Sequence, residues 1–298
     1  VFDFMATKSR YPTGVHPLLA EETARRRRIE VRFVERFEAA GFDEVVLPII
    51  DYVEPYAGLV DSAAARQSYR FVDREGDLVA IRADFTPMLA RALAPTITAG
   101  ELPLRLFYRG DVIRVEASRL GANRELFQIG AEIIGDDSID SDVAMLRLAA
   151  ELARTPESEP AMVYNDVSIA SSLIAQSEAV REALAAKRMT SAVPAALRTI
   201  VGKLISGEAT IDDIAPFAPE AAARLCAIGD ALGSDPAFSL HLDDIDESSG
   251  YYTGLRFRVY TGSTRAKVAQ GGRYDTLYER FGLRSSAIGF TFTIDDLD

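Results

Sequence analysis

Cysteine and histidine are scarce in this sequence, and tryptophan is absent. Its 298 residues include one cysteine and two histidines. One cysteine cannot form an intramolecular disulfide, and a single thiol with two distant histidines cannot make a structural zinc site. Cys226 lies in an alanine-rich apolar stretch, so we expect it to be a buried helix residue rather than a nucleophile. We expect no metal and no cofactor, and so few thiols suit a reducing cytoplasm.

Positive charge is also in deficit, with 33 lysines and arginines against 45 aspartates and glutamates and a formal net charge of −12. Binding to nucleic acid depends on clustered Lys and Arg that neutralise phosphates. An acidic chain is a poor candidate for this, although the composition leaves room for local basic patches. No apolar run reaches the ~18 residues of a membrane span, and the first residues show no signal-peptide pattern. We expect neither a nucleic-acid partner nor a membrane.

The common nucleotide-binding and nucleophile motifs are missing too. There is no GxxxxGK[ST], no GxGxxG after a strand and no GxSxG. His16 and His241 lie far apart in the sequence, and no Ser, His and Asp occur in an order typical of a triad. Any active or binding site must therefore be built from polar residues outside these motifs.

What is present is a pattern of strands at both ends of the chain. Residues 17–40 have the apolar spacing of an amphipathic helix, and a short helix should follow Thr86-Pro87. Alanine-rich residues 168–233 predict a helical insertion, which leaves 1–167 and 234–298 as one core with a mixed, mainly antiparallel sheet. Strands are expected at 42–50 (buried), 69–73, 78–82, 104–116, 125–134, 238–244, 254–260, 265–269 and near the C-terminus.

The strand expected at 125–134 alternates between apolar and polar or small side chains. One face carries Phe127, Ile129, Ala131 and Ile133, and the other carries Gln128, Gly130 and Glu132. A polar face on so apolar a strand either meets solvent or forms the floor of a pocket. Glu132 can likewise be a pocket residue or the partner of Arg114 in a surface ion pair. The alternation alone does not choose between these readings.

The segment FYRGDVIRVEASRLGANRELFQIGAEIIG resembles motif 2 of class II aminoacyl-tRNA synthetases, and of histidyl-tRNA synthetase in particular. Arg114 and the Gln128–Glu132 pair match that motif in type and spacing. The helix at 17–40 with EVVLPIIDYVEPY is similar to motif 1, IRADFTP to the family's Arg-Pro-Glu-Gly-Thr segment, GYYTG and GGRYD to its two histidine signatures, and AIGFTFTIDDL to motif 3. The segments occur in the family's order and span nearly the whole chain.

The resemblance implies an α+β fold of the class II synthetase type, with helices flanking the sheet, and a pocket for histidine. Asp84, Thr86 and Gln128 would hold the α-ammonium group, because acidic and amide acceptors suit a cation with three donors. Glu132 and Tyr252 would bracket the imidazole, since an acceptor and a hydroxyl satisfy both ring nitrogens. Arg114 and Tyr251 complete the implied set. The glycines of GGRYD have a simpler reading as a tight turn before a helix.

The sequence departs from the synthetases where they carry the arginines that bind ATP and the reacting carboxylate. Those positions hold Ala122, Glu247 and Asp296, and only Arg114 is kept. Adenylate formation needs preorganised cations at the α-phosphate. One charge pair ~4 Å apart is worth on the order of 4 kcal/mol at an effective dielectric of about 20, and each 1.36 kcal/mol is about tenfold in rate. We therefore do not expect ATP-dependent activation, unless Arg256, Arg258 or Arg273 compensates with another geometry.

A synthetase-like core without these arginines resembles the regulatory subunits of ATP phosphoribosyltransferase. The expected anticodon-binding domain also does not follow motif 3 before Asp298, although a truncated chain explains this equally well. The resemblance implies a non-catalytic protein that pairs through motif 1, assembles with a short-form catalytic subunit and links histidine biosynthesis to histidine level. Two alternatives are an active histidyl-tRNA synthetase or related amino-acid-activating enzyme, and a histidine sensor that acts alone.

Overall fold

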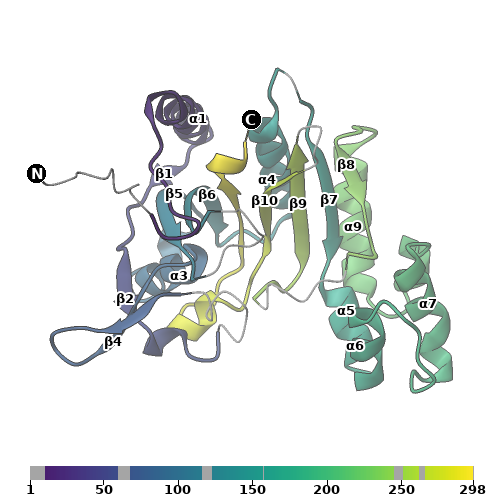
Figure 1. The fold of residues 1–298 in the computed structure, drawn as a ribbon. Coiled ribbons are helices and arrows are strands. Elements are labelled where there is room, and N and C mark those ends of the chain that lie inside the picture. The colour runs from purple at the N-terminus through teal and green to yellow at the C-terminus, as the bar shows by residue number, and fades with distance from the viewer. Residues whose placement is uncertain are drawn as a thin grey trace, which may run out of the picture.

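An eight-stranded sheet, built from segments at both ends of the chain, forms the centre of the computed structural model (Figure 1). The structure describes residues 11–59, 68–115, 123–156, 158–244, 251–261 and 266–297. Neighbouring strands are antiparallel, except for parallel pairs at the two edges, so the predicted mixed, mainly antiparallel sheet is confirmed. In spatial order the strands are β1 (Asp43–Glu44), β5 (Leu104–Ile113), β6 (Glu125–Ile134), β11 (Ala287–Thr293), β10 (Ala266–Arg273), β9 (Leu255–Thr261), β7 (Ala161–Asp166) and β8 (Phe238–Leu240).

Helices cover the two faces of this sheet. On one face, α1 (Ala20–Ala39) buries Phe33 and Phe37, whose rings lie 4.9 Å from Phe292 and 5.3 Å from Phe107. The helix α4 (Ile139–Ala153) joins the same core, and α3 (Thr86–Leu93) packs with Tyr108 in a second core. Successive residues of a strand point to opposite faces, so Phe107 and Tyr108 place these two cores on opposite sides of β5. The strands that would carry a site on this sheet are therefore fixed by packed side chains on both faces.

A smaller sheet of β2 (Ile50–Tyr52), β4 (Leu78–Ile81) and β3 (Arg70–Val72) lies beside the large one (Figure 1). A tight turn joins β3 to β4, with Gly76 at a φ of +95° that favours glycine. The Oδ1 atom of Asp73 accepts the backbone N–H groups of Glu75 and Asp77 in this turn. These three carboxylates could approach a metal ion, but the turn already uses Asp73 in this way.

Between β7 and β8 the regular elements are all helices, as the alanine content predicted. The helices are α5 (Ser168–Ile174), α6 (Glu178–Ala185), α7 (Arg198–Ser206), α8 (Ile211–Ile214) and α9 (Pro219–Leu232), with a 3-10 turn at Ala195–Leu197. Their buried side chains, such as Leu173 and Leu225, belong to the same core as Phe257 of the large sheet. The description of 168–233 as a separate insertion remains a prediction. None of the helices in the described ranges is long and apolar enough to cross a membrane.

A buried ion cluster joins the helical stretch to the sheet. The two carboxylate oxygens of Asp142, on α4, accept from Nε of Arg224 on α9 and from Nε of Arg273 on β10, each at 2.6 Å. Arg273 also donates to Ser141 and to the carbonyl oxygens at the start of α4. Asp142 and Arg273 are almost completely buried, so this cluster fixes where β10 ends.

The expected buried strand at 42–50 is wrong. Only Asp43 and Glu44 pair in the large sheet, and Ile50 begins β2. Between them the chain crosses from one sheet to the other, with Val46 at 89% and Ile49 at 57% exposure. Apolar composition predicted burial, but an apolar segment that runs over the surface has the same composition.

Other expectations differ in detail. Cys226 does lie on a helix, α9, but its side chain is exposed rather than buried. The helix expected from residue 17 begins at Ala20, and the short helix expected near residue 275 is a 3-10 turn at Tyr278–Phe281. Gly271 and Gly272 lie within β10, which is longer than predicted, and not in a turn. Side-chain periodicity defines an element well and its ends poorly.

Candidate functional site

A polar cavity of about 410 Å³ opens over the centre of the large sheet, where β6, β11 and β10 run side by side. Segments far apart in the sequence meet there: the start of α3, the end of β5, the strand β6 and the residues before β9. Most of the described residues that the sequence singled out line this cavity, namely Asp84, Thr86, Arg114, Gln128, Tyr251, Tyr252 and Asp296.

The polar face of β6 faces this cavity and not bulk solvent. Gln128 is buried on the cavity wall, and Gly130 pairs with Thr291 of β11. A Cβ atom on Gly130 would come within 2.6 Å of the Tyr108 hydroxyl, and one on Gly289 within 2.5 Å of the Tyr274 hydroxyl. Glycine is needed at these positions because two tyrosine rings cross the sheet surface there.

The start of α3 brings Asp84 and Thr86 to the cavity. Thr86 is buried and its hydroxyl donates to Oε1 of Glu132 at 2.8 Å. Asp84 accepts the backbone N–H of Thr86 at 3.4 Å and the hydroxyl of Tyr251 at 3.5 Å, both long for hydrogen bonds. Burial raises the pKa of Asp84, and the nearby charge of Arg114 opposes that rise.

Arg82, two residues before Asp84, does not line the polar cavity. Its Nε donates to the carbonyl oxygen of Asp111 at 2.7 Å, and its Nη1 donates to that of Leu47 at 2.9 Å. The guanidinium also lies 4.3 Å from the centre of the Phe85 ring. Arg82 therefore ties the start of α3 to the neighbouring strands.

Glu132 lies beneath the cavity and does not line it. Its side chain is fully buried, and its hydrogen bond with Thr86 takes the place of the surface ion pair with Arg114 that was the alternative. Burial raises the pKa of Glu132 to about 7, and the hydroxyls of Tyr274 and Thr86 partly oppose this. Among the described residues, its Oε2 and the Oε1 of Gln128 have no hydrogen bond of good geometry, although the Tyr274 hydroxyl lies near enough to Glu132 to favour its charged form. Buried acceptors without partners are uncommon and call for an explanation.

Tyrosines form one wall of the cavity. The rings of Tyr251 and Tyr252 lie 4.9 Å apart, and Tyr274 meets Tyr251 edge-on at 5.8 Å. Burial raises the pKa of these hydroxyls, so they stay neutral and can donate hydrogen bonds. A Cβ atom on Gly272 would lie less than 3.0 Å from the backbone of β9 and 3.0 Å from the Tyr252 ring. The glycines of GGRYD thus allow close packing beneath the tyrosines.

Sequence reasoning missed several residues of the cavity. Tyr274 is part of the GGRYD signature, which was the available signal, but the signature did not assign it a role. The strand β10 adds Lys267 and Gln270, which are joined by a hydrogen bond of 2.9 Å, and β11 adds Thr291. Asp295 lies at the edge, where Arg26 of α1 binds its carboxylate at 2.7 Å. No local pattern marks these residues, because strand pairing brings them together.

Arg256, Arg258 and Arg273, the arginines considered for a compensating geometry, each bind a carboxylate away from the cavity. Arg256 and Arg258 both bind the carboxylate of Asp244, and Arg273 binds Asp142. Of the described residues on the cavity wall, Arg114 and Lys267 are the basic ones. Asp296 also lies on the wall, at the end of the 3-10 turn Ile294–Asp296. Ala122 and Glu247 lie outside the described residues.

Comparison with known proteins finds relatives along nearly the whole chain. The family model described as histidyl-tRNA synthetase matches residues 14–297. An ATP phosphoribosyltransferase regulatory subunit from Symbiobacterium thermophilum is 30% identical, with 98% of this chain and 79% of the relative covered. One from a Synechococcus strain is 32% identical, with 97% and 75% covered. The fold is also similar to a solved structure described as an ATP phosphoribosyltransferase regulatory subunit/histidyl-tRNA synthetase from Bacillus halodurans. The TM-score is 0.83 and the sequence identity 23%, and the match covers 98% of this chain and 82% of that one.

Proposed function

Because the chain belongs to the histidyl-tRNA synthetase family, and within it to the ATP phosphoribosyltransferase regulatory subunits, we propose that it is the regulatory partner of a short-form catalytic subunit. In this role it has no catalysis of its own. The catalytic subunit requires it for activity, and it conveys histidine level to the first step of histidine biosynthesis. A cytoplasmic location follows from that partnership.

The polar cavity is the histidine site of this proposal, and its unpartnered acceptors are the observation that carries it. Oε1 of Gln128 and Oε2 of Glu132 are buried without hydrogen bonds of good geometry among the described residues. Asp84, with its two long hydrogen bonds, joins Gln128 and Thr86 in holding the α-ammonium group. Tyr252 meets the imidazole from the cavity wall, with Arg114 and Tyr251 completing the site, and Glu132 acts on the imidazole from beneath that wall.

The charges of the cavity support a binding role over an adenylating one. A transition state that builds up negative charge at a phosphate needs several fixed cations. The described part of the wall carries two basic residues, Arg114 and Lys267, and three acidic ones, Asp84, Asp295 and Asp296. Positive charge does not dominate this surface, and Asp296 occupies the expected position of the motif 3 arginine.

We further propose that two copies pair through motif 1 within the larger complex. The segment that joins β1 to β2 exposes Val46 and Ile49, and Ile50 follows at the start of β2 with half of its surface in solvent. Neighbouring exposed apolar side chains of this kind mark interaction surfaces. Histidine then favours one arrangement of the complex, and inhibition follows from its different affinity for the two arrangements.

Mixing the purified chain with a short-form ATP phosphoribosyltransferase tests the main proposal. We expect a stable complex, higher turnover of the catalytic subunit and inhibition by histidine. Absence of both a complex and any change in turnover would favour a histidine sensor that acts alone. Robust ATP–pyrophosphate exchange with histidine by the pure chain would instead identify an amino-acid-activating enzyme.

Gln128→Ala tests the histidine site. The variant removes one unpartnered acceptor, and we expect the Kd for histidine, measured by calorimetry, to rise about tenfold or more, since one hydrogen bond to a charged group is worth ~1.5–3 kcal/mol. Gln176→Ala is the matched control, because Gln176 is exposed and bonds only locally to Ser172. Equal affinities of the two variants would move histidine to another site, such as the contact with the catalytic subunit.

A further inference from the structure

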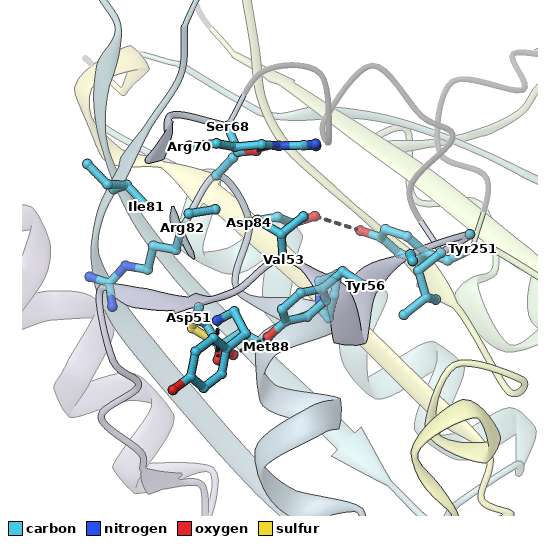
Figure 2. Close-up of a pocket in the computed structure, with 17 residues that line it drawn as sticks. Asp51, Val53, Tyr56, Ser68, Arg70, Ile81, Arg82, Asp84, Met88 and Tyr251 are labelled. Carbon is cyan, nitrogen blue, oxygen red and sulfur yellow. Dashed lines mark hydrogen bonds between the residues drawn. The ribbon is translucent and has the colours of Figure 1, made fainter. Parts of the chain in front are cut away.

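A second cavity, of about 290 Å³, lies between the small sheet and the start of α3 (Figure 2). Its walls come from β2, β4, the 3-10 turn Glu54–Tyr56 and α3, so it is distinct from the polar cavity on the large sheet. Of the described residues, Asp84 and Tyr251 alone line both cavities. The hydrogen bond between these two side chains, drawn in Figure 2, marks the boundary.

The interior of this second cavity is mainly apolar. Val53, Leu59, Ile81, Pro87 and Met88 line it, and Val53 projects into the middle of the view in Figure 2. The volume is near the lower end of the ~300–1,000 Å³ of ordinary ligand pockets, which suits a metabolite of amino-acid size. Apolar walls with a few polar groups are typical of such pockets.

The two carboxylates of this cavity differ in how well they are satisfied. Asp51 accepts from Nη1 of Arg91 at 2.6 Å and from the hydroxyl of Tyr56 at 2.6 Å, so its charge is paired. Asp84 accepts two long hydrogen bonds, at 3.4 and 3.5 Å, and has no close ion pair like that of Asp51 among the described residues, although the charge of Arg114 lies nearby. A cation that enters this cavity would therefore be attracted to Asp84 and not to Asp51.

Arg70 supplies the opposite charge on the same cavity. It lies on β3, where its Nε donates to the hydroxyl of Ser68 at 3.2 Å, and in Figure 2 it runs along the wall above Asp84. The planar guanidinium matches the geometry of a carboxylate. Asp84 and Arg70 together thus offer one site for an ammonium group and one for a carboxylate, beside an apolar chamber.

We propose that this cavity binds a second small molecule, an α-amino acid with an apolar side chain. Its ammonium group binds Asp84, its carboxylate binds Arg70, and its side chain fills the space between Val53, Leu59 and Met88. Because Asp84 also borders the polar cavity, the two ligands compete for one carboxylate. Each ligand then weakens the binding of the other by the same factor.

Val53→Phe fills this chamber without changing any group of the polar cavity. We expect calorimetry with L-methionine and L-leucine to show binding to the wild-type chain, and at least a tenfold weaker affinity for the variant. Val72→Phe is the matched control, since Val72 is exposed on β3 and does not line the cavity. N-acetyl-L-methionine, which lacks the ammonium group, should not bind.

Histidine separates this proposal from the previous one. The histidine affinity of Val53→Phe should equal that of the wild type, and saturating L-methionine should raise the Kd for histidine in the wild type only. No binding of either apolar amino acid to the wild type would overturn the proposal. The proposal would also be overturned if Val53→Phe still bound the apolar amino acid while Gln128→Ala did not, because the ligand would then occupy the polar cavity.

Discussion

Replacing Glu132 by glutamine should stabilise the protein at neutral and higher pH. The carboxylate is fully buried, and its Oε2 has no hydrogen bond of good geometry among the described residues. Glutamine has nearly the same shape and stays neutral, and its carbonyl oxygen can still accept from the Thr86 hydroxyl. The variant thus removes the cost of a buried charge and keeps the packing.

The size of the effect follows from the pKa of Glu132, which burial raises from 4.5 to about 7. At 1.36 kcal/mol per pKa unit, a rise of about 2.5 units costs the ionised folded protein about 3 kcal/mol. The folded state binds the proton more tightly than the unfolded state, so this contribution is favourable below about pH 4.5 and is lost as the pH rises through about 7. Above that pH, Glu132→Gln should unfold on the order of 5–10 °C higher than the wild type.

Thermal and urea unfolding between about pH 5 and 8 would measure this difference directly. We expect the wild type to lose stability relative to Glu132→Gln as the pH rises. Glu151→Gln is the control, because its hydrogen bond with Arg36 lowers the pKa of this exposed carboxyl and gives the opposite pH trend. If Glu132→Gln were no more stable than the wild type at about pH 8, the inferred burial cost would be refuted.

Two further substitutions test how the site is held. Gly272→Ala should lower both the free energy of unfolding and the affinity for histidine, because the added Cβ would lie less than 3.0 Å from the carbonyl oxygen of Leu255. Unfolding and calorimetry on the same sample would show whether both fall. Asp142→Asn should cost ~3–5 kcal/mol, because it leaves the buried cations of Arg273 and Arg224 without their shared carboxylate. A loss within ~0.5 kcal/mol in urea unfolding would mean that the cluster is not needed.

Much of the fold was readable from residue periodicity. The alternation in 125–134 predicted β6, and the change to alanine-rich helices at 168 is present. The motif order predicted that Asp84, Gln128 and Tyr252 would meet, and these side chains do line one cavity. Such features depend on local spacing and residue type, which a single chain displays directly.

Exposure and hydrogen-bond partners were not readable in this way. The apolar run at 42–50 proved to be a crossing between two sheets that buries Phe42 and Leu47 but exposes Val46 and Ile49, and Cys226 faces solvent. Glu132 proved to lie beneath the cavity, bound to Thr86, and not on the cavity wall. These properties depend on which distant segments meet, so no pattern within one segment contains them.

By itself, then, the sequence determined the order of most elements, and it predicted which polar residues gather around one cavity and that Asp296 takes the place of an arginine. The tertiary structure alone decided that Asp84 stands between two cavities, that β10 contributes to the polar one and that Arg256 and Arg273 are held by other carboxylates. The physical reason is that side-chain type is a local property, whereas burial, charge pairing and cavity shape come from packing between residues far apart in the chain.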